Sequence, residues 1–187
     1  MLTLRRDDGY ELCTDPRRVD VDRVHHWLST DAYWAIGQPR ETLLRAIEGS
    51  TVYAVYAPDS GRQAAFARLV TDGATFGYLC DVYVDPAARG IGLARWIVRT
   101  VREDLDRLGV RRILLATWDA HGVYAEVGFT PLADPSQWME LRLRQASAAP
   151  APQPDPLTPP GPVTPPGPVT PLTGKESEPV KPLTLGS

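Results

Sequence analysis

The chain has 187 residues, with 23 acidic and 20 basic side chains and a formal net charge of −3. This length suits one domain with a sizeable core and some additional chain. The charge provides no basic surface for nucleic acid, and no apolar run is long enough to cross a membrane. Arginine and aspartate near the N-terminus replace the apolar stretch of a signal peptide. We therefore expect a cytoplasmic protein that binds neither nucleic acid nor membrane.

The spacing of apolar residues predicts the elements in chain order. The first third of the chain contains one strand and two helices, and the middle third contains three strands joined by turn sequences. A long helix then separates the third of these strands from a short buried strand, so the two should pair in parallel through a right-handed crossover. A short helix and two closing strands follow. The predicted ranges are 10–14, 21–28, 40–48, 51–57, 63–70, 74–84, 91–108, 112–117, 120–127, 129–132 and 138–143.

Residues 81–98 predict a strand, a turn with two glycines and the start of the long helix. The first turn of a helix has amides without acceptors, and glycine lets an anion approach the backbone closely. Gly90 and Gly92 therefore mark a candidate phosphate site, although an ordinary glycine turn before a core helix has the same pattern. The P-loop and the dinucleotide-binding fingerprint are both excluded, because neither Gly-Lys-Ser/Thr nor Gly-x-Gly-x-x-Gly occurs here.

Two motifs resemble those of one enzyme family. Arg89-x-x-Gly92-x-Ala94 is similar to the pyrophosphate loop of the GCN5-related N-acetyltransferases (GNAT), Gln/Arg-x-x-Gly-x-Gly/Ala. The run from Tyr124 to Phe129 resembles the family's Tyr-x-x-x-Gly-Phe, and the predicted element order over residues 8–144 is that of the family. The resemblance implies an α/β (α+β) fold, with a mixed, mostly antiparallel sheet that splays at its central strands and helices on both faces.

The resemblance also implies acetyl-CoA as co-substrate. We expect no metal, because no spacing of histidine, cysteine, aspartate and glutamate resembles a zinc site. The pantetheine arm of acetyl-CoA would lie in the gap of the splayed sheet and bond to the strand backbone. The Tyr124 hydroxyl would protonate the departing thiolate, unless this side chain only packs the core. Thr117 stands where the family has asparagine. The implied cofactor-binding residues are Val82, Tyr83, Val84, Arg89, Gly90, Ile91, Gly92, Leu93, Ala94, Arg95 and Thr117.

An amine that attacks acetyl-CoA must first lose a proton, so we expect a general base. Asp81, near the expected splay, is the first candidate, and Asp119 and His121 are the alternatives. In the family the first helices form the acceptor wall, and aromatic side chains there would suit an aromatic or cationic amine. The same side chains are equally typical of core and surface positions. The candidate acceptor-binding residues are His25, Trp27, Tyr33, Trp34, Asp119 and His121.

We therefore predict transfer of acetyl from acetyl-CoA to a primary amine of a small molecule, by direct attack in a ternary complex. A protein lysine or N-terminus is the alternative acceptor, and a non-catalytic CoA-binding module is the alternative function. An enclosed aromatic wall would favour the small molecule, and an open groove would favour a peptide. Cys13 and Cys80 should be reduced core residues, although Cys80 is also a candidate nucleophile. The sequence does not decide whether the protein forms a homodimer.

We expect an acetyltransferase domain over residues 1–145 and a disordered proline-rich tail over 146–187. The tail has 13 of the 19 prolines, and Pro-Pro-Gly-Pro-Val-Thr occurs twice, at 159–164 and 165–170. A segment with so few large apolar residues cannot offset the entropy lost on ordering. Its composition also makes it a candidate ligand for a proline-reading partner.

Overall fold

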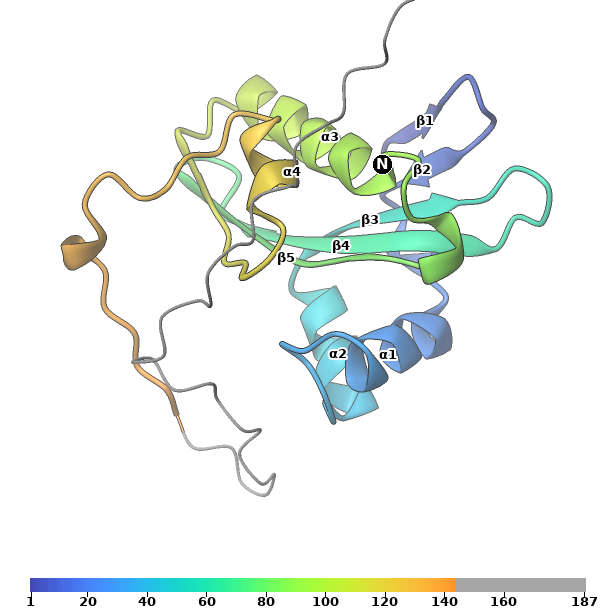
Figure 1. Cartoon of the computed structure of the whole chain (residues 1–187), viewed down its shortest axis with the longest axis horizontal. Helices are drawn as coiled ribbons and strands as arrows, with labels where there is room; N and C mark the ends of the chain where they lie inside the picture. The colour runs from blue at the N-terminus through green and yellow to red at the C-terminus, as the bar shows by residue number, and fades with distance from the viewer. Residues whose placement is uncertain (144–187) are drawn as a thin grey trace, which may run out of the picture. The chain divides into compact units, whose positions relative to one another are not determined.

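The computed structural model describes residues 1–143, which form a six-stranded sheet with helices on both faces (Figure 1). The strands lie across the sheet in sequence order, and all neighbours are antiparallel except β5 and β6, which are parallel. The strands are β1 (Thr3–Arg5), β2 (Glu11–Cys13), β3 (Thr51–Tyr56), β4 (Gln63–Thr71), β5 (Phe76–Val84) and β6 (Arg112–Leu114). The α-helices are α1 (Val21–Thr30), α2 (Arg40–Glu48), α3 (Leu93–Arg107) and α4 (His121–Ala125), and the 3-10 helices are η1 (Pro16–Arg18), η2 (Pro86–Ala88) and η3 (Pro135–Gln137).

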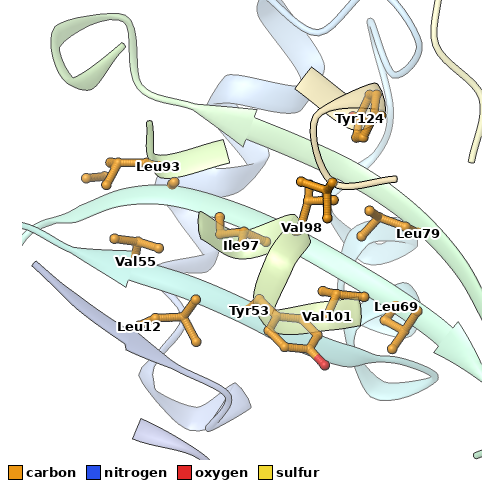
Figure 2. Close-up of a cluster of buried hydrophobic side chains, with 14 of the residues drawn as sticks. Leu12, Tyr53, Val55, Leu69, Leu79, Leu93, Ile97, Val98, Val101 and Tyr124 are labelled. Atoms are coloured by element: carbon orange, nitrogen blue, oxygen red, sulfur yellow. The ribbon is translucent and has the colours of Figure 1, made fainter. Parts of the chain in front are cut away.

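Helices α1 and α2 cover one face of the sheet, and α3 and α4 lie on the other (Figure 1). Helix α3 buries Leu93, Ile97, Val101 and Leu105, which recur every four residues and therefore share one face of the helix. These side chains belong to one apolar cluster with residues of β3, β4 and β5. Figure 2 shows part of this cluster, including Leu93, Ile97 and Val101. Tyr124 of α4 also belongs to this cluster, which fixes the position of its ring.

The sheet opens along the second half of β5. Only residues 76–78 of β5 pair with β6, so within the described chain residues 79–84 have no strand on that side. At the same level β5 contains a β-bulge, because Asp81 and Val82 both lie opposite the single residue Ala67 of β4. Asp81 has a φ of 53°, in the left-handed region that aspartate tolerates better than most residues. The bulge and the short β6 together produce the splay that the family resemblance implied.

Most predicted elements are confirmed, including helix 40–48, the hairpin of β3 and β4, and the parallel pairing of β5 with β6. Helix α3 begins at Leu93 and not at residue 91, because Gly92 has a left-handed φ of 81° that no α-helix contains. Strand β1 was missed in the sequence, since three residues that include one charged side chain give too short an alternation.

The two predicted closing strands are wrong. Residues 129–132 and 138–143 form no strand, and the 3-10 helix η3 lies between them. Alternation of apolar residues indicates a strand only where a neighbouring strand supplies hydrogen bonds and a covered face. Here Met139, Leu141 and Leu143 are exposed to solvent. The alternating pattern was therefore present in the sequence, but no neighbouring strand pairs with these residues in the described structure.

In the part of the chain that the structure describes, no helix is both long enough and apolar enough to cross a membrane. The predicted proline-rich tail at 146–187 lies outside the described residues, and so does the predicted domain boundary at residue 145.

Candidate active site

A cavity of about 700 Å³ lies where β5 and β6 separate. It is bounded by the α1–α2 loop (residues 31–39), by β5, by Arg89, by the β6–α4 loop (residues 115–120) and by α4. The lining residues are Asp31, Ala32, Tyr33, Trp34, Tyr78, Leu79, Cys80, Asp81, Val82, Tyr83, Val84, Arg89, Ala116, Thr117, Trp118, Asp119, Ala120 and Tyr124. Segments far apart in the sequence thus meet at the opening of the sheet, which is where the sequence motifs predict the active site.

The glycine turn (residues 89–92) precedes α3 and has the geometry of an anion site. Gly90 and Gly92 have φ values of 83° and 81°, and a Cβ at either position would meet no atom within 4 Å. The amides of residues 90–95 have no acceptor among the described residues, and the Trp96 amide is the first in the helix to donate, to the Gly92 carbonyl at 3.0 Å. These amides lie at the positive end of the α3 dipole, so the turn fits a diphosphate.

The Arg89 side chain lies beside the turn and contacts the α1–α2 loop. Its Nη2 is 3.2 Å from Asp31 Oδ2, and its Nε donates to the Val84 carbonyl at 3.1 Å. Asp31 also accepts a hydrogen bond from the Tyr83 hydroxyl. The Tyr83 hydrogen bond and, secondarily, Arg89 lower the pKa of the Asp31 carboxyl. This group of contacts therefore connects the glycine turn to the start of the α1–α2 loop.

The remaining predicted residues of the turn differ in environment. Leu93 is fully buried in the core, whereas Ile91 is half-exposed and its carbonyl accepts from Arg6 Nη1 at 3.1 Å. Arg95 extends toward α4, with its Nε 2.6 Å from Glu126 Oε2. The backbone of this segment, more than its side chains, is thus available to a ligand.

Tyr124 lines the cavity, and only 9% of the residue is exposed. Burial raises the pKa of its phenol to about 12, with smaller contributions from Tyr33 and Asp119. The phenol is therefore protonated at neutral pH and can act as a proton donor. Thr117 also lines the cavity, and its Oγ1 accepts from the Ala120 amide at 3.2 Å.

Both carboxylate oxygens of Asp81 are engaged. Oδ2 lies 2.6 Å from Arg68 Nε, and Oδ1 accepts from Trp34 Nε1 at 3.2 Å. Arg68 is fixed further by the Ala46 carbonyl and the Ser50 hydroxyl. Asp81 thus fastens the α1–α2 loop to the bulge, and its assignment as general base stays a prediction.

Three of the predicted acceptor-binding residues, Tyr33, Trp34 and Asp119, line the cavity together. Trp118, which we did not predict, joins them. Its indole stacks on the Tyr33 ring at 5.5 Å and 29°, and its backbone N–H donates to the Tyr33 hydroxyl at 3.2 Å. The Trp34 ring meets Tyr33 edge-on at 4.9 Å. A tryptophan directly after a predicted strand and beside Asp119 was the available sequence signal.

The other three predicted residues lie outside the cavity lining. Trp27 is buried and stacks on the Tyr83 ring at 5.2 Å, while His25 Nε2 lies 2.9 Å from the Gln38 carbonyl. His121 is exposed at the first turn of α4. These positions do not support a direct role in acceptor binding for His25, Trp27 or His121.

The cysteines are both free thiols. Cys80 lines the cavity, but burial raises its pKa to about 11, so the thiol is protonated at neutral pH and a poor nucleophile. In residues 1–143 no three histidine, cysteine or acidic side chains are grouped closely enough to hold a metal ion.

The family model of the acetyltransferases known as the GNAT family matches residues 21–129. The chain belongs to the GNAT acetyltransferase family. The match includes both sequence motifs and all the lining residues of the cavity described above. This acetyltransferase therefore has its cavity, glycine turn and Tyr124 within the segment that defines the family.

Two relatives match this acetyltransferase in sequence. A protein of Gibberella zeae whose name places it among the acetyltransferases is 33% identical over 128 residues, which are 59% of this chain and 72% of that protein. The chloroplastic serotonin N-acetyltransferase 2 of Oryza sativa subsp. japonica is 37% identical over 108 residues. That match covers 53% of this chain and 53% of the rice protein, so it spans about half of that relative.

Solved structures agree with the fold. A crystal structure from Xanthomonas campestris pv. campestris, described as a GNAT acetyltransferase, is 41% identical to this acetyltransferase, with a TM-score of 0.67. The match covers 72% of this chain and 93% of the Xanthomonas chain. A Mycobacterium tuberculosis protein in complex with CoA is 24% identical over 64% of this chain and 70% of its own, with a TM-score of 0.54. At this level of identity, the similarity to the Mycobacterium tuberculosis protein shows a common fold and nothing more.

Proposed function

We propose that this acetyltransferase transfers the acetyl group of acetyl-CoA to a primary amine of a small molecule, by direct attack in a ternary complex. The observation that carries the choice of a small acceptor is the contact between Tyr33 and Trp118. It joins the α1–α2 loop to the β6–α4 loop beside the cavity. A protein substrate would need an open groove between these loops, whereas a small amine needs only an enclosed recess.

The residues present fit acetyl-CoA. Amides of residues 90–95 would hold its diphosphate, and the backbone of β5 beyond Tyr78 would bond to the pantetheine arm in the opening of the sheet. When bound, acetyl-CoA supplies the activated acyl group. Among proteins of this fold, the Mycobacterium tuberculosis structure contains CoA, which supports the same ligand here.

Tyr124 is the proposed acid. As the amine nitrogen bonds to the acyl carbon and the carbon–sulfur bond breaks, the departing thiolate takes the proton of the Tyr124 phenol. The amine loses a proton to a carboxylate, directly or through water, and both Asp81 and Asp119 line the cavity. Holding the amine beside the acyl group in one cavity supplies much of the rate enhancement through proximity.

The test uses the full chain and measures CoA release from acetyl-CoA with two panels, small primary amines and lysine-containing peptides. We expect turnover with small amines and at least about tenfold lower kcat/KM with peptides. Faster turnover of peptides would identify a protein acetyltransferase. Binding of CoA without turnover of any acceptor would identify a non-catalytic CoA-binding module.

A further inference from the structure

Residues 138–143 expose a regular series of apolar side chains. Met139, Leu141 and Leu143 are 97%, 83% and 79% exposed, and they alternate with Glu140 and Arg142. Such alternation is typical of a strand that buries one of its two faces. Single apolar residues on a surface are normal, but three large ones at alternate positions indicate a surface that a partner covers.

A groove next to β6 offers a place for an added strand. Strand β6 is the last in the sheet order, so among the described residues no strand pairs with its outer edge. An unpaired edge provides backbone hydrogen bonds to an incoming strand. The groove, which we call the β6 groove, has a volume of about 490 Å³ and lies between the second half of α3, β6 and residues 127–133. It includes Ile113, Leu114 and Leu132, so its lining is partly apolar.

The chain does not place its own residues 138–143 in this groove. The Trp138 ring lies 5.3 Å from the guanidinium carbon of Arg112, at the first residue of β6. Exposure then rises from 40% at Trp138 to 97% at Met139, and in Figure 1 the segment (orange) leads away from the sheet. The segment thus begins beside the open edge and leaves it.

The connection that precedes the segment sets this direction. The Asp134 carboxylate accepts from the Ser136 amide at 3.1 Å and from Gln137 Nε2 at 2.8 Å. Pro135 lies between these contacts and has a fixed φ. Residues 134–137 therefore hold one conformation, and a connection that directs a strand away from its own sheet favours exchange of that strand between copies.

The charges of the groove and of the segment are complementary. The groove is lined by three basic residues and one acidic residue, which are Arg102, Arg111, Arg112 and Asp106. Residues 134–143 have the opposite balance, with two acidic residues and one basic residue, which are Asp134, Glu140 and Arg142. The chain itself thus contains a segment that fits the groove in both apolar pattern and charge.

We infer that two copies of this chain form a symmetric dimer by exchanging residues 138–143. The segment of each copy adds a strand to β6 of the other, and its apolar face covers Leu132 and the apolar side chains of β6. Each copy offers one groove and one segment, so two copies leave neither without a partner and the assembly closes. The exchange does not depend on the proposed reaction.

The first test measures the mass of the full chain in solution by size-exclusion chromatography with light scattering. We expect a dimer. Leu141→Asp should raise the Kd of the dimer at least about 100-fold, since burial of a leucine corresponds to about a factor of ten or more and the change occurs twice. Ile36→Asp, at a 53% exposed position of the α1–α2 loop, is the control and should leave the dimer intact.

Two results of this measurement would overturn the inference. A wild-type chain that stays monomeric would show that no exchange occurs. A dimer that Leu141→Asp leaves intact would form through another surface. Met139→Asp repeats the test at a 97% exposed position, where an aspartate does not disturb the folded chain.

The second test distinguishes exchange from every other dimer. Leu132→Asp alters the groove and Leu141→Asp alters the strand, and circular dichroism checks that both variants fold. In a mixture, the intact groove of one variant can bind the intact strand of the other. Two substitutions at one site cost less than the same two at separate sites, because the first already breaks that site.

The mixed dimer should therefore have a Kd at least about tenfold lower than that of either variant alone. Labelled Leu141→Asp chain, titrated with unlabelled Leu132→Asp chain and followed by fluorescence anisotropy, measures this difference. No gain on mixing would overturn the reciprocal exchange.

Discussion

Arg89 and Asp31, 58 residues apart in the sequence, form an ion pair of 3.2 Å between the glycine turn and the start of the α1–α2 loop. Both side chains are 55% exposed, so the pair adds little to the stability of the fold. Its consequence is positional, because the segment that we propose to bind the diphosphate is connected to the loop that carries Tyr33 and Trp34. The same guanidinium is a ready partner for a phosphate.

Replacing Asp31 with asparagine should therefore affect the two substrates in opposite directions. Without the carboxylate, Arg89 is free to bind phosphate, so the Kd for CoA should fall about threefold. The α1–α2 loop loses one attachment, so the KM for the amine should rise by a similar factor. Calorimetry with CoA and steady-state kinetics measure the two effects. Asp22→Asn breaks the exposed ion pair with Arg40 and is the control, with no change expected in either constant.

The glycine turn can be tested with a matched pair of glycines. Gly92→Ala should cost about 1–2 kcal/mol of stability because of its left-handed φ. It should also weaken CoA binding at least about tenfold, because the methyl group keeps the diphosphate from the amides. Gly61 has a φ of 61°, equally open surroundings and a place in the hairpin of β3 and β4. Gly61→Ala should therefore lower Tm similarly and leave CoA binding unchanged; a similar loss of binding in both variants would refute the assignment.

Tyr124→Phe should lower kcat about 100-fold with little change in Tm, since the phenylalanine ring fills the same position in the core. With a pKa of about 12, Tyr124 should cause no loss of kcat through its own ionisation below about pH 11. The measurement is a pH profile of kcat from pH 6 to 10. An unchanged kcat in the variant would show that another group protonates the thiolate.

Stability should fall at alkaline pH. Burial raises the pKa of Tyr56, Tyr83 and Tyr124 to about 12, from an ordinary value of 10. The folded state thus keeps these protons when the unfolded state releases them. The stabilisation is complete below pH 10 and is lost as the pH rises toward 12. Urea unfolding at pH 8, 10 and 11 measures this loss, which should be smaller in Tyr124→Phe.

Removing either partner of the ion pair of Asp81 with Arg68 should destabilise the fold. Arg68→Met leaves a mostly buried carboxylate without a cation and should cost about 3 kcal/mol. Asp81→Asn leaves the guanidinium unpaired and should also destabilise. The double variant should lose less than the sum of the two single variants, and urea unfolding of all four proteins measures that coupling. Additive losses would show that the two groups do not interact appreciably.

Much of the fold was predictable because its signals are local. The spacing of apolar residues in α3 and the glycines before it are readable in one short window, as is the motif around Tyr124. The contacts that complete the site are not local. Periodic patterns of apolar residues do not predict which distant segments come together. Three such contacts complete the site: Arg89 with Asp31, Arg68 with Asp81, and Tyr33 with Trp118. The closing strands failed for a similar reason, since a strand depends on a partner that its own sequence does not specify.

The left-handed backbone at Asp81 limits how this position can vary among related proteins. Only glycine, asparagine and aspartate adopt that conformation at low cost, so homologues with the same β-bulge should draw on these three residue types. Where aspartate is replaced by glycine, the arginine opposite should be lost with it. Such paired variation would mark, in sequence alone, the members of the family that share this way of attaching the loop above the cavity.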